Sequence, residues 1–265
     1  MKYIRFLHPE TKIPTYGIVN GNDIRLCKGE ALWKLSETDD ILPLTTIDKY
    51  LPPVDPPNVI ALGINYDAHA TETKQLVPKE PLMLLKATTS VLGHRDKILL
   101  PKLAPNEVDY EGELTIVMGR KARNLTENEA LDYVFGWTCG NDVTARDCQF
   151  KRDMQWARAK SFDTFCPLGP CIETTLDPSN VRIQTRVNKR LLQDSNSSNM
   201  IFPVETVVSY LSCCMTLLPG TVVMTGTPAG VGFRRNPPLY LRSGDVVEVT
   251  IDKIGTLENM VSTEP

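Results

Sequence analysis

Short apolar runs separated by turn-forming residues recur along the whole chain, and they predict many strands and few helices. The expected strands cover residues 3–7, 15–19, 24–27, 58–63, 81–85, 114–118, 181–187, 221–224 and 245–251. Two helices are expected. One follows the capping box of Thr126 and Glu129, and the other has Pro203 in its first turn and runs to about Met215. The pattern predicts an α+β fold that is mostly β.

A proline-rich segment divides the chain. Residues 51–57 read Leu-Pro-Pro-Val-Asp-Pro-Pro, which cannot be helical and is typical of a stiff linker. We therefore expect a small N-terminal β-rich subdomain at residues 1–57 and a main domain at residues 58–265. The Asn-Gly-Asn-Asp sequence at residues 20–23 predicts a tight turn within the first unit.

Composition narrows the function classes. A formal net charge of −3 gives no electrostatic footprint for nucleic acid or an anionic membrane surface, so neither is an expected partner. No uninterrupted apolar run approaches the ~20 residues that span a bilayer. Seven cysteines without a C-x-x-C pair favour a reduced compartment. We expect the protein to lie in the cytoplasm, and a mitochondrial location stays open. Cys213 and Cys214 lie in an apolar segment and are expected in the core.

Two carboxylates stand at the start of the most apolar strand. Glu111 and Glu113 are two residues apart, so on a strand both point to one face. Gly112 between them allows a ligand or another backbone to come close. The simplest alternative is a solvated strand end, but paired carboxylates are costly to keep ionised without a cation between them. With only three histidines in the chain, such a cation would be a hard metal ion bound by oxygen.

A histidine and a glutamate form a second candidate pair. If Asp67 caps a short helix, His69 and Glu72 lie on one face and can touch, which fixes the tautomer of the imidazole and raises its basicity. The alternative is a surface helix on which both side chains meet only water. The polar segment 73–80 that follows would suit a mobile lid.

Further polar side chains follow other apolar runs. On a helical turn beginning near Asp142, Arg146 and Gln149 would share its face, either as a substrate site or as a simple Asp142–Arg146 ion pair. Lys86 ends an apolar strand and is either an edge residue or an anion contact. Lys160 begins a segment expected to be a loop, residues 160–170. The threonines and glycines of residues 225–232 place hydroxyl and N–H groups at a strand end, without the spacing of a nucleotide-binding loop.

Five motifs in this order resemble the fumarylacetoacetate hydrolase superfamily over residues 58–259. They are Gly63-x-Asn65-Tyr66-x-x-His69-x-x-Glu72, Asp109-Tyr110-Glu111-x-Glu113-Leu114, Asn141-Asp142-x-Thr144-Ala145-Arg146-Asp147, Lys160-Ser161-Phe162-Asp163 and Thr225-Gly226-Thr227-Pro228-x-Gly230-Val231-Gly232. The resemblance implies a mixed β-sandwich roll, a homodimer, and a small N-terminal subdomain. The chain departs from the family pattern at Val187-Asn188-Lys189, where relatives commonly have Val-Asn-Gly. Lys189 stands in place of the glycine and would need a positive φ.

The same resemblance assigns the site residues. Glu111, Glu113 and Asp142 would bind Mg²⁺ or Mn²⁺, and His69, Glu72 and Lys160 would be catalytic. The residues around a small keto-acid substrate would be Lys86, Arg146, Gln149 and Thr227. The implied reaction is C–C hydrolysis of an acylpyruvate or decarboxylation of oxaloacetate through an enolate that a metal stabilises. The alternatives are a keto–enol tautomerase or isomerase and, from another class, a non-catalytic metal-binding dimer subunit.

Overall fold

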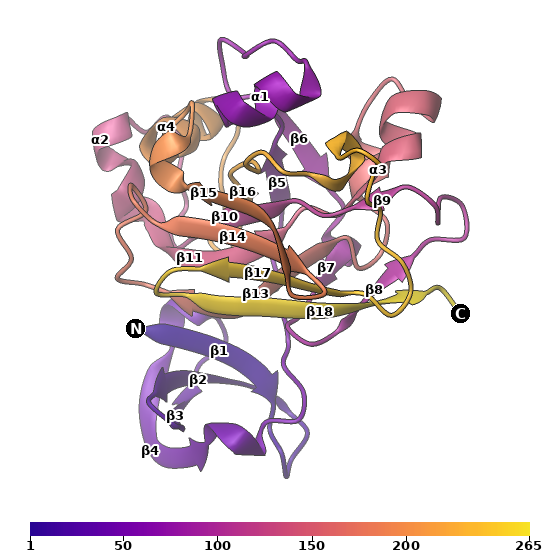
Figure 1. Ribbon diagram of the computed structural model, residues 1–265. Coiled ribbons are helices and arrows are strands. Elements are labelled where there is room, and N and C mark those ends of the chain that lie inside the picture. Colours follow the sequence, from indigo (N-terminus) through magenta and orange to yellow (C-terminus); the bar gives the residue numbers. More distant parts are fainter.

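The computed structural model describes residues 1–265, and most of its regular structure is strand (Figure 1). Four N-terminal strands pair in sequence order: β1 (Lys2–Leu7), β2 (Pro14–Asn20), β3 (Asp23–Lys28) and β4 (Ser36–Pro43). The first three were expected, and the predicted turn at residues 20–23 joins β2 to β3, whereas β4 was not expected. Strand β1 also pairs with β13 (Cys166–Glu173), so these strands extend the largest sheet. Figure 1 shows them below the rest of the molecule. The division at residue 57 stays a prediction.

The largest sheet has eleven strands and carries the central strand β10. Its order is β4-β3-β2-β1-β13-β11-β10-β16-β5-β6, and β7 pairs with β13. The members not yet introduced are β5 (Val59–Leu62), β6 (Met83–Lys86), β7 (Val91–Leu92), β10 (Gly112–Met118), β11 (Val134–Asn141) and β16 (Val222–Met224). Strand β16 is antiparallel to β10 but parallel to β5. The sheet is therefore mixed, as expected.

A second sheet of five strands has the order β15-β14-β17-β18-β8. Its strands are β8 (Lys97–Leu100), β14 (Arg182–Val187), β15 (Arg190–Asn196), β17 (Val246–Ile251) and β18 (Gly255–Thr263). The strand expected at residues 245–251 is β17, and β18, which was not expected, follows it and pairs along its free edge. In the β14–β15 turn, Asn188 and Lys189 have φ of 50° and 68°, so Lys189 adopts the expected positive φ.

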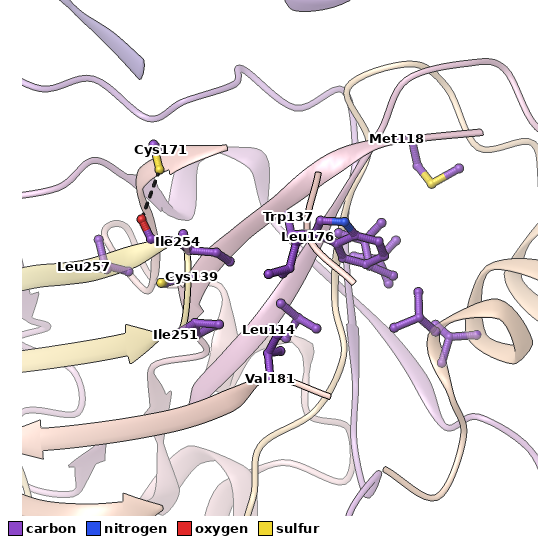
Figure 2. Close-up of a cluster of buried hydrophobic side chains, with 14 of the residues drawn as sticks. Leu114, Met118, Trp137, Cys139, Cys171, Leu176, Val181, Ile251, Ile254 and Leu257 are labelled. Atoms are coloured by element: carbon purple, nitrogen blue, oxygen red, sulfur yellow. Dashed lines mark hydrogen bonds between the residues drawn. The ribbon is translucent and has the colours of Figure 1, made fainter. Parts of the chain in front are cut away.

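Apolar clusters pack on both faces of β10, and the main cluster lies between the two sheets. Alternate β10 residues such as Leu114 and Ile116 belong to the main apolar cluster, together with Ile183 and Ile251 of the second sheet. Figure 2 shows Leu114 and Val181 beside Ile251, and the Cys171 thiol donating to the carbonyl of Ile254. Val117 points to the other face and packs in a separate cluster. A strand buried on both faces reads as a continuous apolar run, which is how residues 114–118 appear in the sequence.

The α-helices are short and lie away from the N-terminal strands (Figure 1). They are α1 (Asp67–Thr73), α2 (Glu127–Ala130), α3 (Ala157–Lys160) and α4 (Val204–Cys214), with a π-helix at Cys148–Arg152. The predicted capping box precedes α2, and Pro203 is the N-cap of α4. No helix combines the length and apolar content needed to cross a bilayer.

Two local predictions are wrong. Cys213 and Cys214 are exposed, because they are the last two residues of α4. The buried residues of the helix, including Val204, Val207 and Leu211, all precede them. Lys160 does not lie in a loop but is the last residue of α3. All seven cysteines are free thiols.

Candidate active site

Three buried carboxylates meet where β10 and β11 pair. Glu111 immediately precedes β10, Glu113 lies within it, and Asp142 directly follows β11. The backbone N–H of Asp142 donates to the carbonyl of Glu111 at 2.8 Å, which ties the two strand ends together. One carboxylate oxygen from each residue lies within 4.8 Å of the others. The structure thus brings together the three residues that the motifs selected.

Gly112 allows side chains of the second sheet to approach β10 closely. A Cβ atom at this position would lie 2.0 Å from Thr185 Oγ1 of β14. The backbone N–H of Gly112 donates to Gln193 Oε1 at 3.0 Å, and its carbonyl accepts from Thr227 Oγ1 at 3.0 Å. The glycine therefore fits β10 against the second sheet.

Three cationic side chains surround the carboxylates. Lys160 donates from Nζ to Glu111 Oε2 at 2.7 Å and also contacts Asp142. Lys86 is fully buried and contacts the other oxygen of Asp142. Arg146 donates from Nη2 to Glu111 Oε1 at 2.6 Å and from Nε to Asp109 Oδ2 at 2.9 Å.

The expected helical turn from Asp142 is wrong. Residues Thr144–Ala145 form strand β12, which pairs with β9 (Val108–Asp109), so the backbone after Asp142 is extended. An extended backbone carries Arg146 away from Asp142 and toward Asp109, and no ion pair joins Arg146 to Asp142. The contact between Arg146 and Gln149 does form, at 2.8 Å, because Gln149 lies in the following π-helix.

The neighbours of each carboxylate set its ionisation. Burial opposes the charge on Glu111, but the ammonium of Lys160 and the guanidinium of Arg146 outweigh burial and hold the pKa of Glu111 well below its usual range. Burial raises the pKa of Glu113 well above its usual value, and the charges of Asp142 and Glu111 raise it further. Burial also opposes the charge on Lys160, but Asp142 and Glu111 keep the pKa of that ammonium raised.

The donor set fits a divalent hard cation. Four buried carboxylates, including Asp109, face only the three cations Lys86, Arg146 and Lys160, and Glu113 forms no ion pair. Glu113 Oε2 accepts from the N–H of Gly226 at 2.7 Å, whereas its Oε1 is buried without a hydrogen-bond partner. A buried carboxylate oxygen with no partner is costly, and a cation beside it would remove that cost. Three oxygen ligands of this kind suit Mg²⁺ or Mn²⁺.

The predicted dyad forms beside these carboxylates. His69 Nδ1 lies 2.8 Å from Glu72 Oε1, and both residues belong to α1. His69 is buried, and Glu72 is half-buried. Asp67 is the first residue of α1, and its N-cap is Tyr66, so the predicted cap is wrong. His69, Glu111, Arg146, Gln149 and Lys160 line one cavity of about 20 Å³. That volume holds about one water molecule, so the groups face each other at close range.

The glycine-rich loop after β16 holds three carboxylates through its backbone. The N–H of Gly226 donates to Glu113, that of Gly230 to both oxygens of Glu72 at 3.0 Å, and that of Gly232 to Asp109 Oδ1 at 2.8 Å. At Gly232 a Cβ atom would lie 1.9 Å from the carbonyl oxygen of Leu239, so only glycine fits there. The N–H groups that the sequence placed at this strand end therefore bind side chains of the protein.

Two of the four residues selected as substrate ligands do not line the cavity. The hydroxyl of Thr227 is bonded to Gly112 and Gln193, and Lys86 lies behind Asp142, where it also donates to the carbonyl of Phe165. Their roles as substrate ligands stay predictions.

The sequence reasoning missed four residues. Asp109 anchors Arg146, and its place in the Asp109-Tyr110-Glu111 motif was the available signal. The aromatic residues Phe150, Trp156 and Phe233 line the cavity, and no spacing rule identified them.

The fumarylacetoacetate (FAA) hydrolase C-terminal profile matches residues 58–262. The chain belongs to the fumarylacetoacetate hydrolase family. An uncharacterized protein of Archaeoglobus fulgidus is 54% identical over 218 residues, covering 82% of this chain and 83% of its own. The mitochondrial oxaloacetate tautomerase fahd2 of Xenopus laevis is 43% identical over 231 residues, covering 86% of this chain and 72% of its own. The crystal structure of 5-carboxymethyl-2-hydroxymuconate delta-isomerase from Mycobacterium smegmatis superimposes with a TM-score of 0.89 at 38% identity, covering all of both chains. The mostly β fold expected from the sequence is confirmed.

Proposed function

We propose that this member of the fumarylacetoacetate hydrolase family is a metal-dependent enzyme that moves protons on a small 2-keto acid by way of its enolate. The observation that carries the proposal is the single cavity lined by His69, Glu111 and Lys160, in which His69 is the residue bonded to Glu72. A proton-transfer group beside an acidic cation site is what enolate chemistry requires.

Glu111, Glu113 and Asp142 would hold Mg²⁺ or Mn²⁺. When bound, such an ion supplies Lewis-acid polarisation of the carboxylate and keto oxygens of a 2-keto acid. This part of the proposal rests on the partnerless oxygen of Glu113 and on the all-oxygen donor set.

His69 is the proton carrier in this proposal. Because Nδ1 is engaged by Glu72, the proton is taken up and released at Nε2. Glu72 is held by the Gly230 N–H and keeps the imidazole in one orientation. Lys160 keeps Glu111 ionised and places a positive charge beside the developing enolate. Arg146 and Gln149, which line the same cavity, would bind the substrate carboxylate.

Keto–enol tautomerisation of oxaloacetate needs the least from this site, since one base takes a proton from carbon and returns it to oxygen. Relatives named oxaloacetate tautomerase and delta-isomerase support this reaction type. Hydrolysis of a C–C bond is the second candidate. It is favoured by the match to the fumarylacetoacetate hydrolase profile, and it would use His69 to deprotonate a water molecule. Decarboxylation depends more on the metal than on the base.

The experiment is a parallel assay of three reactions with Mg²⁺ and with EDTA. Oxaloacetate enol–keto conversion is followed by absorbance, oxaloacetate decarboxylation by pyruvate formation, and acetylpyruvate hydrolysis by loss of the diketone. We expect tautomerisation to be the fastest and to stop in EDTA. Metal binding without turnover of either substrate would instead favour a non-catalytic metal-binding subunit.

The remaining parts of the proposal concern assembly and compartment. We propose a homodimer with a small keto acid as its only substrate class. The seven free thiols favour a reduced compartment, either the cytoplasm or the mitochondrial matrix.

A further inference from the structure

Each of the three carboxylates at the candidate cation site has one oxygen that is held by a different donor of the protein. The three contacts are Gly226 N–H to Glu113 Oε2 at 2.7 Å, Arg146 Nη2 to Glu111 Oε1 at 2.6 Å, and Lys86 Nζ to Asp142 Oδ1. No carboxylate has both oxygens held in this way. Each residue therefore keeps one oxygen for an ion.

The other oxygens are the ones available to an ion. Lys160 Nζ donates to Glu111 Oε2 at 2.7 Å and also contacts Asp142 Oδ2, so these two oxygens converge on one point. The third oxygen, Glu113 Oε1, is buried without a hydrogen-bond partner. Lys160 lines the cavity. An ion bound by these three oxygens would compete with Lys160 for two of them, but it would not compete with Lys86.

Lys86 is fixed behind Asp142. Its side chain is fully buried and does not line the cavity. Besides Asp142 Oδ1, its Nζ donates only to the carbonyl of Phe165, at 3.0 Å. The same carbonyl accepts from the backbone N–H of Val143, the residue after Asp142, at 3.1 Å. The ammonium is thus held from two sides, and it prevents the Asp142 carboxylate from turning both oxygens toward an ion.

The number of oxygens that each carboxylate offers discriminates between hard cations. Ca²⁺ takes about six to eight oxygen ligands and accepts bidentate carboxylates, whereas Mg²⁺ requires near-octahedral geometry and keeps several waters. Mn²⁺ also suits octahedral oxygen sites. Three carboxylates that offer one oxygen each suit Mg²⁺ or Mn²⁺, and release of a second oxygen would favour Ca²⁺.

We propose that Lys86 is a positioning residue that limits Asp142 to one oxygen for the ion, and that it thereby makes the site favour Mn²⁺ and Mg²⁺ over Ca²⁺. Lys86 acts through Asp142 and does not touch the substrate. This inference rests on the proposed function, because it requires an ion at the three carboxylates. It adds a residue that decides which ion binds.

The test compares the binding of Mn²⁺ and Ca²⁺ by calorimetry, which requires no turnover. The proteins are the wild type, Lys86→Met, Lys86→Gln and the control Arg234→Met. Glutamine is one bond shorter than lysine, so it withdraws the donor from Asp142 Oδ1 but leaves a polar group in the buried site. Arg234 forms no ion pair and contacts the carbonyl of Glu72, so its replacement removes the same charge near the site but frees no carboxylate oxygen. Thermal unfolding identifies the variants that fold.

For the wild type we expect Mn²⁺ to bind at least about tenfold more tightly than Ca²⁺. In Lys86→Met and Lys86→Gln this ratio should fall by about tenfold, the lower end of the effect of groups that orient metal ligands. Loss of a charge alone, or a general loss of stability, would change both affinities by the same factor. The ratio therefore separates positioning from both effects, and Arg234→Met should keep the wild-type ratio.

A wild-type ratio near one would overturn the inference and leave the proposed function standing. The wild-type ratio retained in whichever Lys86 variant folds, or an equal fall in Arg234→Met, would do the same. Failure of the wild type to bind either ion would overturn both the inference and the proposed function.

Discussion

The backbone N–H of Gly230 lies 3.0 Å from both carboxylate oxygens of Glu72, although 158 residues separate them in the sequence. Gly230 has a φ of 110°, and a Cβ atom there would lie 2.2 Å from the carbonyl oxygen of Leu192. Glycine is therefore required at the point where the loop after β16 holds the dyad on α1. The carboxylate that orients His69 is itself positioned by backbone from the other end of the chain.

Gly230→Ala should displace this loop from Glu72. We expect metal-dependent activity to fall by roughly 10²-fold, as for a displacement of about 1 Å in a catalytic group. Gly244→Ala is the matched control, because Gly244 has a φ of 95° but no neighbouring atom within 4 Å of an added Cβ. Both variants carry backbone strain of about 1–3 kcal/mol, measured by thermal unfolding. Equal activity in the two variants would show that the Gly230 contact does not position the dyad.

Glu113→Ala should abolish tight metal binding while the protein remains folded. Replacement of residues that merely support a metal ligand reduces affinity about 10–100-fold, so loss of a ligand should cost at least 100-fold. Calorimetry with Mg²⁺ or Mn²⁺ measures the change. Glu37→Ala, an exposed glutamate on β4, serves as the control. Wild-type affinity in Glu113→Ala would place the ion elsewhere.

Arg146→Met should lower stability as well as substrate binding. Arg146 is buried between Asp109 and Glu111, so its removal leaves the buried Asp109 without an ion-pair partner and Glu111 with Lys160 alone. Breaking such a pair costs about 3–5 kcal/mol in the free energy of unfolding, measurable in urea. Adding Asp109→Asn to Arg146→Met should restore part of that loss. Strictly additive losses in the double variant would contradict a direct interaction. Oxalate inhibition of Arg146→Met tests its proposed role in substrate binding.

His69→Ala separates the candidate reactions. If His69 moves a proton, tautomerisation and C–C hydrolysis should fall by roughly 10²–10⁴. Oxaloacetate decarboxylation should fall far less, because loss of CO₂ requires no proton abstraction. Glu72→Gln should show part of the same effect, since it keeps an acceptor near His69 Nδ1 but loses the charge. Equal losses in all three reactions would indicate a binding or lid-closing role for His69.

His94 should make stability depend on pH below neutrality. Burial and the charge of Arg95 lower its pKa to about 4, and its Nδ1 accepts from the backbone N–H of Glu258, so the folded protein holds it neutral. In the unfolded chain its pKa is about 6.5. Between these values the unfolded state binds one more proton, so stability falls as the pH drops from about 6.5 to about 4.

The size of this effect is a few kcal/mol at most, at about 1.4 kcal/mol per pKa unit. Denaturant unfolding at several pH values measures it. His94→Asn, which keeps an acceptor near the Nδ1 position, should flatten the dependence over that window. An unchanged slope in this variant would assign the pH dependence to other groups.

The sequence by itself determined the β-rich architecture and the residue types of the candidate site. Period-two patterning, tight-turn residues and helix caps are local signals, so β2, β3, α2 and α4 could be predicted from short windows. Glu111, Glu113 and His69 could also be selected from short windows. Glu111 and Glu113 are two residues apart, and His69 is three residues from Glu72. Such signals do not extend to contacts between distant segments.

Tertiary structure decided which groups meet. The extended backbone at β12 directs Arg146 to Asp109, where helical spacing had suggested Asp142. The glycine loop reaches Glu113 across 113 residues of sequence, and Phe233 reaches the cavity only because that loop folds over α1. Backbone hydrogen bonds between paired strands fix these contacts. Local periodicity does not specify which strands pair. The residue types are local information, whereas their partners are a property of the packed sheets.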